Sequence, residues 1–151
     1  MKRQIGLIGG ALAVVAAVTL STSTASAALP RQDFTATQNG NGPIKVTASG
    51  VINATGKDIP LSDTRDRFAF PNGNLIITHV PTSQSESSDD CVSRFHEEGR
   101  YKIVSGTKAY RGAEGSGTYE VNVVVRGCDP NKPPKEFHLR IDADGVIDLD
   151  S

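Results

Sequence analysis

The sequence predicts an all-β protein, a single small antiparallel up-and-down β-barrel of seven or eight strands. Several short runs alternate apolar and polar residues, as Phe137, Leu139 and Ile141 do with the polar residues between them. Glycine, proline, asparagine and aspartate separate these runs, and no stretch beyond residue 27 has a helical period. A chain of 151 residues is one domain. Closure into a barrel, rather than packing as a sandwich, removes the edges that an open sheet exposes.

The first elements follow from local composition. Residues 28–43 are polar and rich in Gly, Asn and Gln, which predicts a loose N-terminal segment. A strand is expected over residues 44–55, with a bulge at Gly50. The sequence Pro-Asn-Gly separates the runs 66–70 and 74–80, and it predicts a tight hairpin between two strands.

The second half of the chain continues the pattern. Residues 81–90 are rich in serine and acidic residues, which predicts a mobile loop. Residues 91–103 predict one long strand that bends at Gly99. The run 135–142 alternates cleanly and predicts another strand. The dipeptide Asp-Gly at 144–145 then predicts a tight turn before a short final strand.

The most specific segment covers residues 103–125, a strand, a glycine-rich turn and a second strand. The segment contains the pattern V-x-G-T-x-x-Y-x-x-A-x-G, formed by Val104, Gly106, Thr107, Tyr110, Ala113 and Gly115. This pattern resembles the signature segment of the allene oxide cyclase and dirigent-like β-barrel superfamily. The chain as a whole resembles a bacterial secreted protein of that group. The resemblance implies a β-barrel that associates into homo-oligomers through outward faces, whereas an ordinary glycine-rich hairpin is the alternative.

Residues 1–27 have the features of a signal peptide. Lys2 and Arg3 precede an apolar run, and Ala-Ser-Ala at 25–27 fits a cleavage site. The apolar run is short for a membrane anchor, so we expect a secreted, extracellular protein with no membrane span after cleavage. The β-barrel domain is then expected over residues 44–151. Cleavage removes two basic residues from a chain of net charge −1, which argues against a nucleic-acid partner.

The chain has two cysteines, Cys91 and Cys128, both beyond the predicted signal peptide. An even pair in an oxidising compartment predicts one disulfide bond. The alternative, a reactive thiol or a metal ligand, has no support nearby, because there is no CxxC motif and no histidine close to Cys128 in the sequence.

The histidines do not predict a metal site. His79, His96 and His138 form neither an HxH nor an HExxH spacing, so we expect them at the surface or at the mouth of the barrel. A metal site would have to be assembled from several strands by the fold. Asp66, which lies among other charged residues, is expected to be a solvated surface charge.

A calcium site near the C-terminus is a weaker alternative than a turn. Asp142 and Asp144 are followed by further acidic residues, and hard cations bind clustered carboxylates. The segment lacks the remaining ligands of a twelve-residue calcium loop. We therefore expect no metal ion and no cofactor.

The barrel interior is the candidate binding site. An eight-stranded barrel is either filled by its own side chains or holds one small ligand. The aromatic residues on the inward parity of their strands are the candidates for contact with a small apolar ligand: Phe68, Phe70, Phe95, Tyr101, Tyr119 and Phe137. The alternative is that these residues form a filled core.

We therefore expect a secreted barrel that binds a small apolar molecule or an extracellular partner protein. One alternative is an isomerase or cyclase for an unsaturated lipid or terpenoid, since such barrel enzymes hold the substrate in a reactive shape. Tyr101, Tyr119, Glu120 and His138 are the candidate catalytic residues. Glu120 and His138 lie on the outward parity, which counts against them. The other alternative is a structural protein that acts through its surface.

Overall fold

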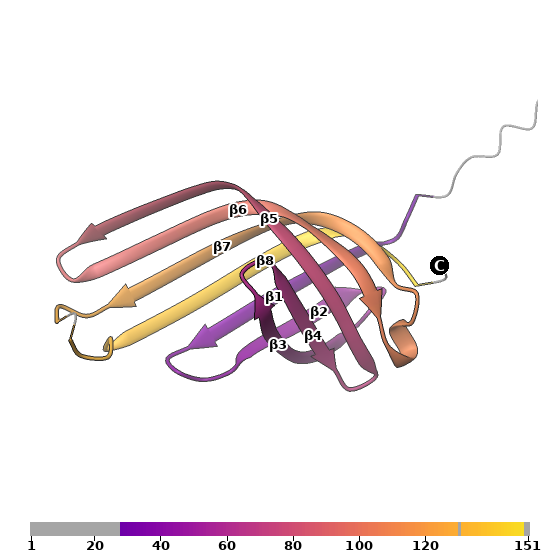
Figure 1. The fold of residues 1–151 in the computed structure, drawn as a ribbon, viewed down its shortest axis with the longest axis horizontal. Helices are drawn as coiled ribbons and strands as arrows, with labels where there is room; N and C mark the ends of the chain where they lie inside the picture. The colour runs from indigo at the N-terminus through magenta and orange to yellow at the C-terminus, as the bar shows by residue number, and fades with distance from the viewer. Residues whose placement is uncertain (1–27, 130, 150–151) are drawn as a thin grey trace, which may run out of the picture.

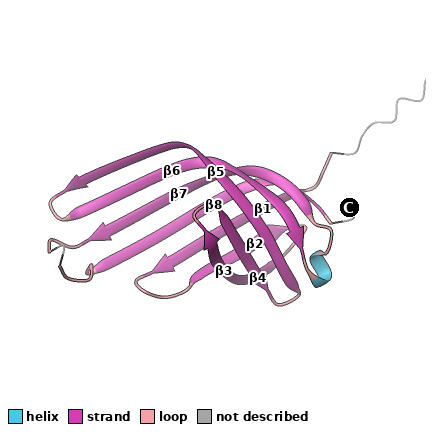
Figure 2. Cartoon of the chain, in the orientation of Figure 1, coloured by secondary structure: helices cyan, strands magenta, loops and turns pink. Residues whose placement is uncertain are grey.

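The chain forms a closed eight-stranded β-barrel in the computed structural model, which describes residues 28–129 and 131–149 (Figure 1). The predicted signal peptide, residues 1–27, lies outside the described residues. The strands are β1 (Arg31–Asn39), β2 (Ile44–Gly50), β3 (Ala54–Ser62), β4 (Arg65–Phe70), β5 (Gly73–Asp89), β6 (Val92–Gly106), β7 (Glu114–Arg126) and β8 (Glu136–Asp148). A short 3-10 helix, η1 (Lys108–Tyr110), connects β6 to β7 (Figure 2). Within the described part of the chain, no helix has the length and apolarity that a membrane span needs.

Each strand pairs antiparallel with the next, and β1 pairs with β8 to close the barrel. In this closing pair, Ala36 lies opposite Ile141, and on its other side it lies opposite Val46 of β2. The observed topology confirms the predicted up-and-down barrel. Closure gives every strand two neighbours in the barrel wall, so its backbone groups are paired on both sides.

Two tight turns connect β4 to β5 and β5 to β6. The β4–β5 turn follows the Pro-Asn-Gly signal, and Gly73 is needed because a side chain there would meet the carbonyl oxygen of Thr107. The β5–β6 turn consists of Asp90 and Cys91, both with positive φ, which is the geometry of a two-residue hairpin that matches the strand twist. The first hairpin therefore follows from local chemistry, whereas the second places Cys91 in a left-handed conformation that favours glycine.

The last four strands are longer than the first four, and they continue beyond the barrel as one sheet. They contain 13 to 17 residues, compared with 6 to 9 in β1–β4. β5 pairs with β4 only as far as Thr78, whereas its pairing with β6 continues to Asp89. We call the extension residues 79–89 of β5 together with the parts of β6, β7 and β8 that lie alongside them. Figure 1 shows the extension projecting away from the first four strands.

Several sequence predictions about element boundaries are wrong. Residues 31–39, within the segment expected to be loose, form β1, which pairs with β2 and β8. Residues 81–89, expected as a mobile loop, belong to β5. The expected turn at residues 144–145 is instead part of the continuous strand β8. The strand expected over 44–55 is divided in two, because β2 ends at Gly50 and β3 begins at Ala54.

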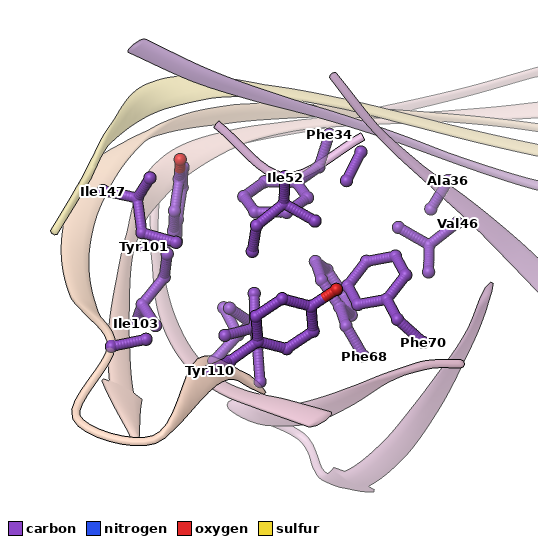
Figure 3. Packing of buried hydrophobic residues seen from close by; sticks show 14 of the residues in the cluster. Phe34, Ala36, Val46, Ile52, Phe68, Phe70, Tyr101, Ile103, Tyr110 and Ile147 are labelled. Carbon is purple, nitrogen blue, oxygen red and sulfur yellow. The ribbon is translucent and has the colours of Figure 1, made fainter. Parts of the chain in front are cut away.

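Side chains fill the part of the barrel furthest from the extension (Figure 3). Phe34 contacts the rings of Phe68 and Tyr101 edge-on, with centroids 5.3 and 6.2 Å apart. At the far end, η1 places Tyr110 against Phe70, with ring centroids 6.1 Å apart. Edge-to-face contacts of this kind are the preferred packing of aromatic rings in a core. The filled-core alternative therefore holds for this end of the barrel.

A buried glutamine joins β1 to the β2–β3 turn. The Gln32 side chain is fully buried, and its Nε2 donates to the carbonyl oxygens of Asp33, Ser49 and Ile52. Its Oε1 accepts a hydrogen bond from the backbone N–H of Ile52 at 2.7 Å. Because both ends of the amide are satisfied, burial of this polar group is compatible with a stable fold.

Candidate binding pocket at the barrel mouth

A cavity of about 70 Å³ lies at the mouth of the barrel, where the extension begins. Its walls are mostly apolar: Phe34, Phe68, Ile77, Tyr101, Val121, Ile141 and Ala143. The remaining lining residues carry polar or charged groups: Asp58, Asp66, His79, Glu97 and Tyr119. A concave apolar site with a few converging polar groups is the usual form of a small-molecule pocket.

Strand register brings the polar groups together. Asp58 of β3 lies opposite Phe68, and Asp66 of β4 lies opposite Ile77, so both point to the same side of the sheet as those core residues. Side chains two residues apart on a strand share one face, which places Glu97 on the side of the buried Tyr101. The polar cluster is thus built from five neighbouring strands, β3 to β7.

Asp66 and His79 form the central contact of the cluster. Nε2 of His79 lies 3.1 Å from Oδ2 of Asp66, and both side chains are largely buried. The hydrogen bond to Asp66 raises the pKa of His79, and burial opposes it. The charges of Asp66, Glu97 and Asp58 raise this pKa further. At neutral pH the cluster therefore favours the charged form of the imidazole more than water does.

Asp58 is the most buried acid in the cluster. The residue is 7% exposed, and its Oδ1 has no hydrogen-bond partner in the protein. Burial raises the pKa of Asp58 from 3.8 to about 7, with a smaller contribution from the charge of Asp66, while His79 lowers it. The carboxyl group consequently exchanges its proton near neutral pH.

Glu97 and Tyr119 form the third part of the cluster. The Tyr119 hydroxyl donates to Oε1 of Glu97 at 2.7 Å, and Nε2 of Gln84 donates to Oε2 of the same carboxylate. Burial and the contact with Glu97 raise the pKa of Tyr119. The Tyr119 ring packs edge-on against His79, with centroids 5.6 Å apart. Gly99 makes this position available, because a Cβ there would lie 2.5 Å from the tyrosine ring.

Three polar atoms of pocket residues are buried without a protein partner. They are Oδ1 of Asp58, Nδ1 of His79 and the hydroxyl oxygen of Tyr101. Burial raises the pKa of Tyr101 to about 12, so its hydroxyl stays protonated at physiological pH. Because unsatisfied buried polar atoms are rare and destabilising, Oδ1 of Asp58 and Nδ1 of His79 are natural contacts for a bound molecule, whereas the Tyr101 hydroxyl lies against Gly145 of β8.

The pocket contains half of the aromatic residues predicted to contact a ligand. Phe68, Tyr101 and Tyr119 line it. Phe70 is instead buried in the core beside Tyr110. The two others, Phe95 and Phe137, are partly exposed in the extension. These two lie on the side of the sheet that continues the barrel interior, in register with Val123 and Val125.

Two of the four candidate catalytic residues lie outside the pocket. Glu120 is exposed and accepts a hydrogen bond from Asn122. His138 is exposed, and its Nδ1 lies 2.7 Å from Oδ1 of Asn39. Of the candidates, the pocket includes Tyr101 and Tyr119. An isomerase or cyclase activity stays a prediction.

The acidic and imidazole groups of the pocket were not predicted as a site. His79 was expected at the surface or at the mouth, and the mouth position is where it lies. Asp66 was expected to be a solvated charge, but it is largely buried against His79. Glu97 has the inward parity of Phe95 and Tyr101 on the strand expected over residues 91–103, which is a signal that could have found it, whereas the inward parity of Asp58 becomes readable only when the boundaries of β3 are known. Among the described residues, no group of three histidine, cysteine or acidic side chains is arranged to bind a metal ion.

The predicted disulfide between Cys91 and Cys128 is present. The two Cα atoms are 4.5 Å apart, and the backbone N–H of Gly127 donates to the carbonyl oxygen of Cys91 at 2.9 Å. The bond joins the β5–β6 turn to the β7–β8 loop at the tip of the extension. It therefore fixes the extension at the end far from the pocket.

Comparison of the chain with protein-family models, with curated proteins and with solved structures gave no match. Inferences about function consequently rest on the geometry and chemistry of the pocket.

Proposed function

We propose that the protein acts outside the cell by binding a small, largely apolar molecule at the mouth of the barrel. The observation that supports this most directly is the mouth pocket, whose lining combines aromatic and aliphatic walls with two buried polar atoms that lack protein partners, Oδ1 of Asp58 and Nδ1 of His79. Such atoms gain hydrogen bonds when a ligand arrives, while the walls gain apolar contact. The disulfide is compatible with an extracellular location.

The size of the pocket indicates how a ligand would lie. A cavity of about 70 Å³ is roughly half the volume that holds a benzene molecule in an engineered protein core. Only one end of a larger molecule would therefore enter it. The rest would lie on the neighbouring surface of the extension, where Phe95, Val123 and Leu139 form one cross-strand row. All three side chains are partly exposed and apolar, as a contact surface of this kind requires.

Titration with the neutral fluorescent probe N-phenyl-1-naphthylamine tests the proposal. We expect the probe to bind the wild-type protein with increased fluorescence. In Val121→Phe, the larger ring fills part of the pocket, so the affinity for the probe should fall at least fivefold.

Val104→Phe is the matched control. Val104 lies on β6, is 45% exposed and does not line the pocket, so the same substitution there should leave the affinity unchanged. Absence of probe binding to the wild-type protein would contradict the proposal. An equal loss of affinity in both variants would also contradict it, because binding would then lie elsewhere.

A further inference from the structure

We propose that the mouth pocket receives the positively charged head of an apolar monoamine, with the Asp58 carboxylate as its charge partner. This inference rests on the proposed function, since it names the chemical class of the molecule bound there. It follows from the charge of the pocket, from the unpartnered state of Asp58 and from the aromatic walls around it.

The charge of the pocket favours a cation. Three acidic side chains from three strands line it, Asp58, Asp66 and Glu97. The one basic side chain in the lining is His79, and its Nε2 is already in contact with Asp66. A carboxylate or phosphate group in the same space would face three acids at close range, which is unfavourable in a partly buried site. An ammonium group would be attracted by them.

Asp58 is the acid that is open to such a contact. The carboxylate of Glu97 is occupied by Tyr119 and Gln84, and the carboxylate of Asp66 by His79. By contrast, Oδ1 of Asp58 is buried and has no protein partner. An ammonium group has three N–H donors and no acceptor, so it suits this oxygen. The charge-assisted hydrogen bond that results is stronger than a neutral one.

The aromatic walls favour an organic cation. Phe34 packs against both Phe68 and Tyr101, and all three rings line the pocket beside the acids. Ring faces attract ammonium groups, and the attraction increases where water is excluded. A small alkylammonium head also suits the volume of about 70 Å³.

The hydrocarbon part has a continuous apolar path out of the pocket. Val121 and Ile141 lie opposite each other at the mouth, and the next row along the strands is formed by Phe95, Val123 and Leu139. Successive rows on one face of a sheet are about 7 Å apart. An alkyl chain that leaves the pocket along this direction therefore remains in contact with apolar side chains.

Three probes with one tail and different heads test the inference: octylamine, octanol and octanoate. Isothermal titration at pH 7.5 should give octylamine an affinity at least tenfold higher than octanol, with octanoate the weakest. The affinity of Asp58→Asn for octylamine should fall to its affinity for octanol, and its affinity for octanol should equal that of the wild type. Glu120→Gln removes an exposed acid outside the pocket and should keep the tenfold preference.

Proton release provides a second readout. The groups that face Asp58 from the surrounding strands are Asp66, His79, Glu97 and Tyr119. Asp58 has a pKa of about 7, so part of the protein carries its proton at pH 7 and must release it when an ammonium group binds. Titrations of octylamine in two buffers of different ionisation enthalpy should detect this release, and Asp58→Asn should reduce it.

The outcomes separate this inference from the proposed function. If octanol or octanoate binds as tightly as octylamine, the inference is wrong and the proposed function stands. If Asp58→Asn keeps the full preference for octylamine, Asp58 is not the charge partner. If none of the three probes binds, the proposed function fails together with the inference.

Discussion

At the scale of single residues, the binding role proposed for Asp58 is accompanied by a penalty in stability. The Asp58 residue is 7% exposed, so its ionised carboxylate lacks most of the hydration that it would have in water. The fold therefore retains the Asp58 proton up to about pH 7, whereas an aspartate in water loses it near pH 3.8. Functional sites commonly contain groups that are unfavourable for the fold, because the ligand stabilises them when it binds.

The stability of the free protein should consequently fall as the pH rises through this window. Between pH 3.8 and about 7 the unfolded chain releases the Asp58 proton and the folded chain keeps it, so unfolding becomes more favourable with each pH unit. The change is about 1.4 kcal/mol per unit, or about 4 kcal/mol across the window at most. Asp58→Asn removes this term, so its stability relative to the wild type should be higher at pH 8 than at pH 4. Urea unfolding at the two pH values measures the difference.

The comparison between the two proteins isolates Asp58. The pKa of His79 is also raised, so its charged contact stabilises the fold at low pH and is lost as the pH rises through its pKa. This second contribution has the same direction and is largely common to both proteins, because the hydrogen bond to Asp66 is the main cause of the raised pKa of His79 and the charge of Asp58 is the smallest. If the wild type and Asp58→Asn keep a constant difference in unfolding free energy from pH 4 to pH 8, the account of Asp58 is wrong.

The sequence allowed prediction of the aromatic part of the site better than of its polar part. Tyr101 and Tyr119 were predicted to face inward because strand alternation places large apolar side chains on the core side. The same alternation places Asp58 inward, but a lone aspartate in a polar run is typical of a surface position. The contact between Asp66 and His79 joins two strands whose relative register cannot be read from composition. The buried Gln32 was not predicted because it lies in β1, within the segment expected to be loose.

At the scale of strands and loops, the composition of β5 explains why its second half was mistaken for a loop. Residues 81–89 are rich in serine and acidic residues, and they begin with a proline. These residues pair with β6, but their other side lies beyond the end of the pairing with β4. Proline, charge and small polar side chains protect an exposed strand edge from pairing with other molecules. A composition typical of loops is therefore also that of an exposed edge strand.

Close packing between tyrosine rings and glycines is a second property of the long strands. A Cβ at Gly117 would lie 2.1 Å from the carbonyl oxygen of Asp144 and 2.7 Å from the ring of Tyr101. We expect Gly117→Ala to destabilise the protein by about 1–3 kcal/mol, because the backbone of β8 would have to move. Thermal and urea unfolding measure the loss.

Gly42→Ala is the control for this substitution. Gly42 lies between β1 and β2, and the nearest contact of an added Cβ would be the carbonyl oxygen of Asn39 at 3.4 Å. This variant should unfold within about 0.5 kcal/mol of the wild type, as surface substitutions usually do. If Gly117→Ala is equally neutral, the strands are less tightly packed than the structure indicates.

At the scale of the whole molecule, the disulfide connects the β5–β6 turn to the β7–β8 loop at the tip of the extension. It joins residues 37 positions apart, and the closed loop contains the β6–β7 pair. Replacement of Cys91 and Cys128 by serine should lower the free energy of unfolding by about 4 kcal/mol, the loop-closure entropy of a crosslink of this length. Urea unfolding of the double variant measures this change.

Reduction of the wild-type protein is the matching control, since it breaks the same bond without changing any residue. The reduced wild type and the double variant should unfold at the same urea concentration. If both unfold at the same concentration as the oxidised protein, the strand pairing of the extension is sufficient without the crosslink.

The pairing of β1 with β8 has a consequence for the way the molecule is made. The strands that meet at this seam come from opposite ends of the folded domain, as Ala36 and Ile141 do. Contacts between distant parts of a chain form slowly, because a long loop must close first. Until β8 has been synthesised, β1 and β7 each lack a neighbour. The growing chain therefore cannot complete the barrel one hairpin at a time, because β8, which is translated last of the eight strands, is the strand that closes it.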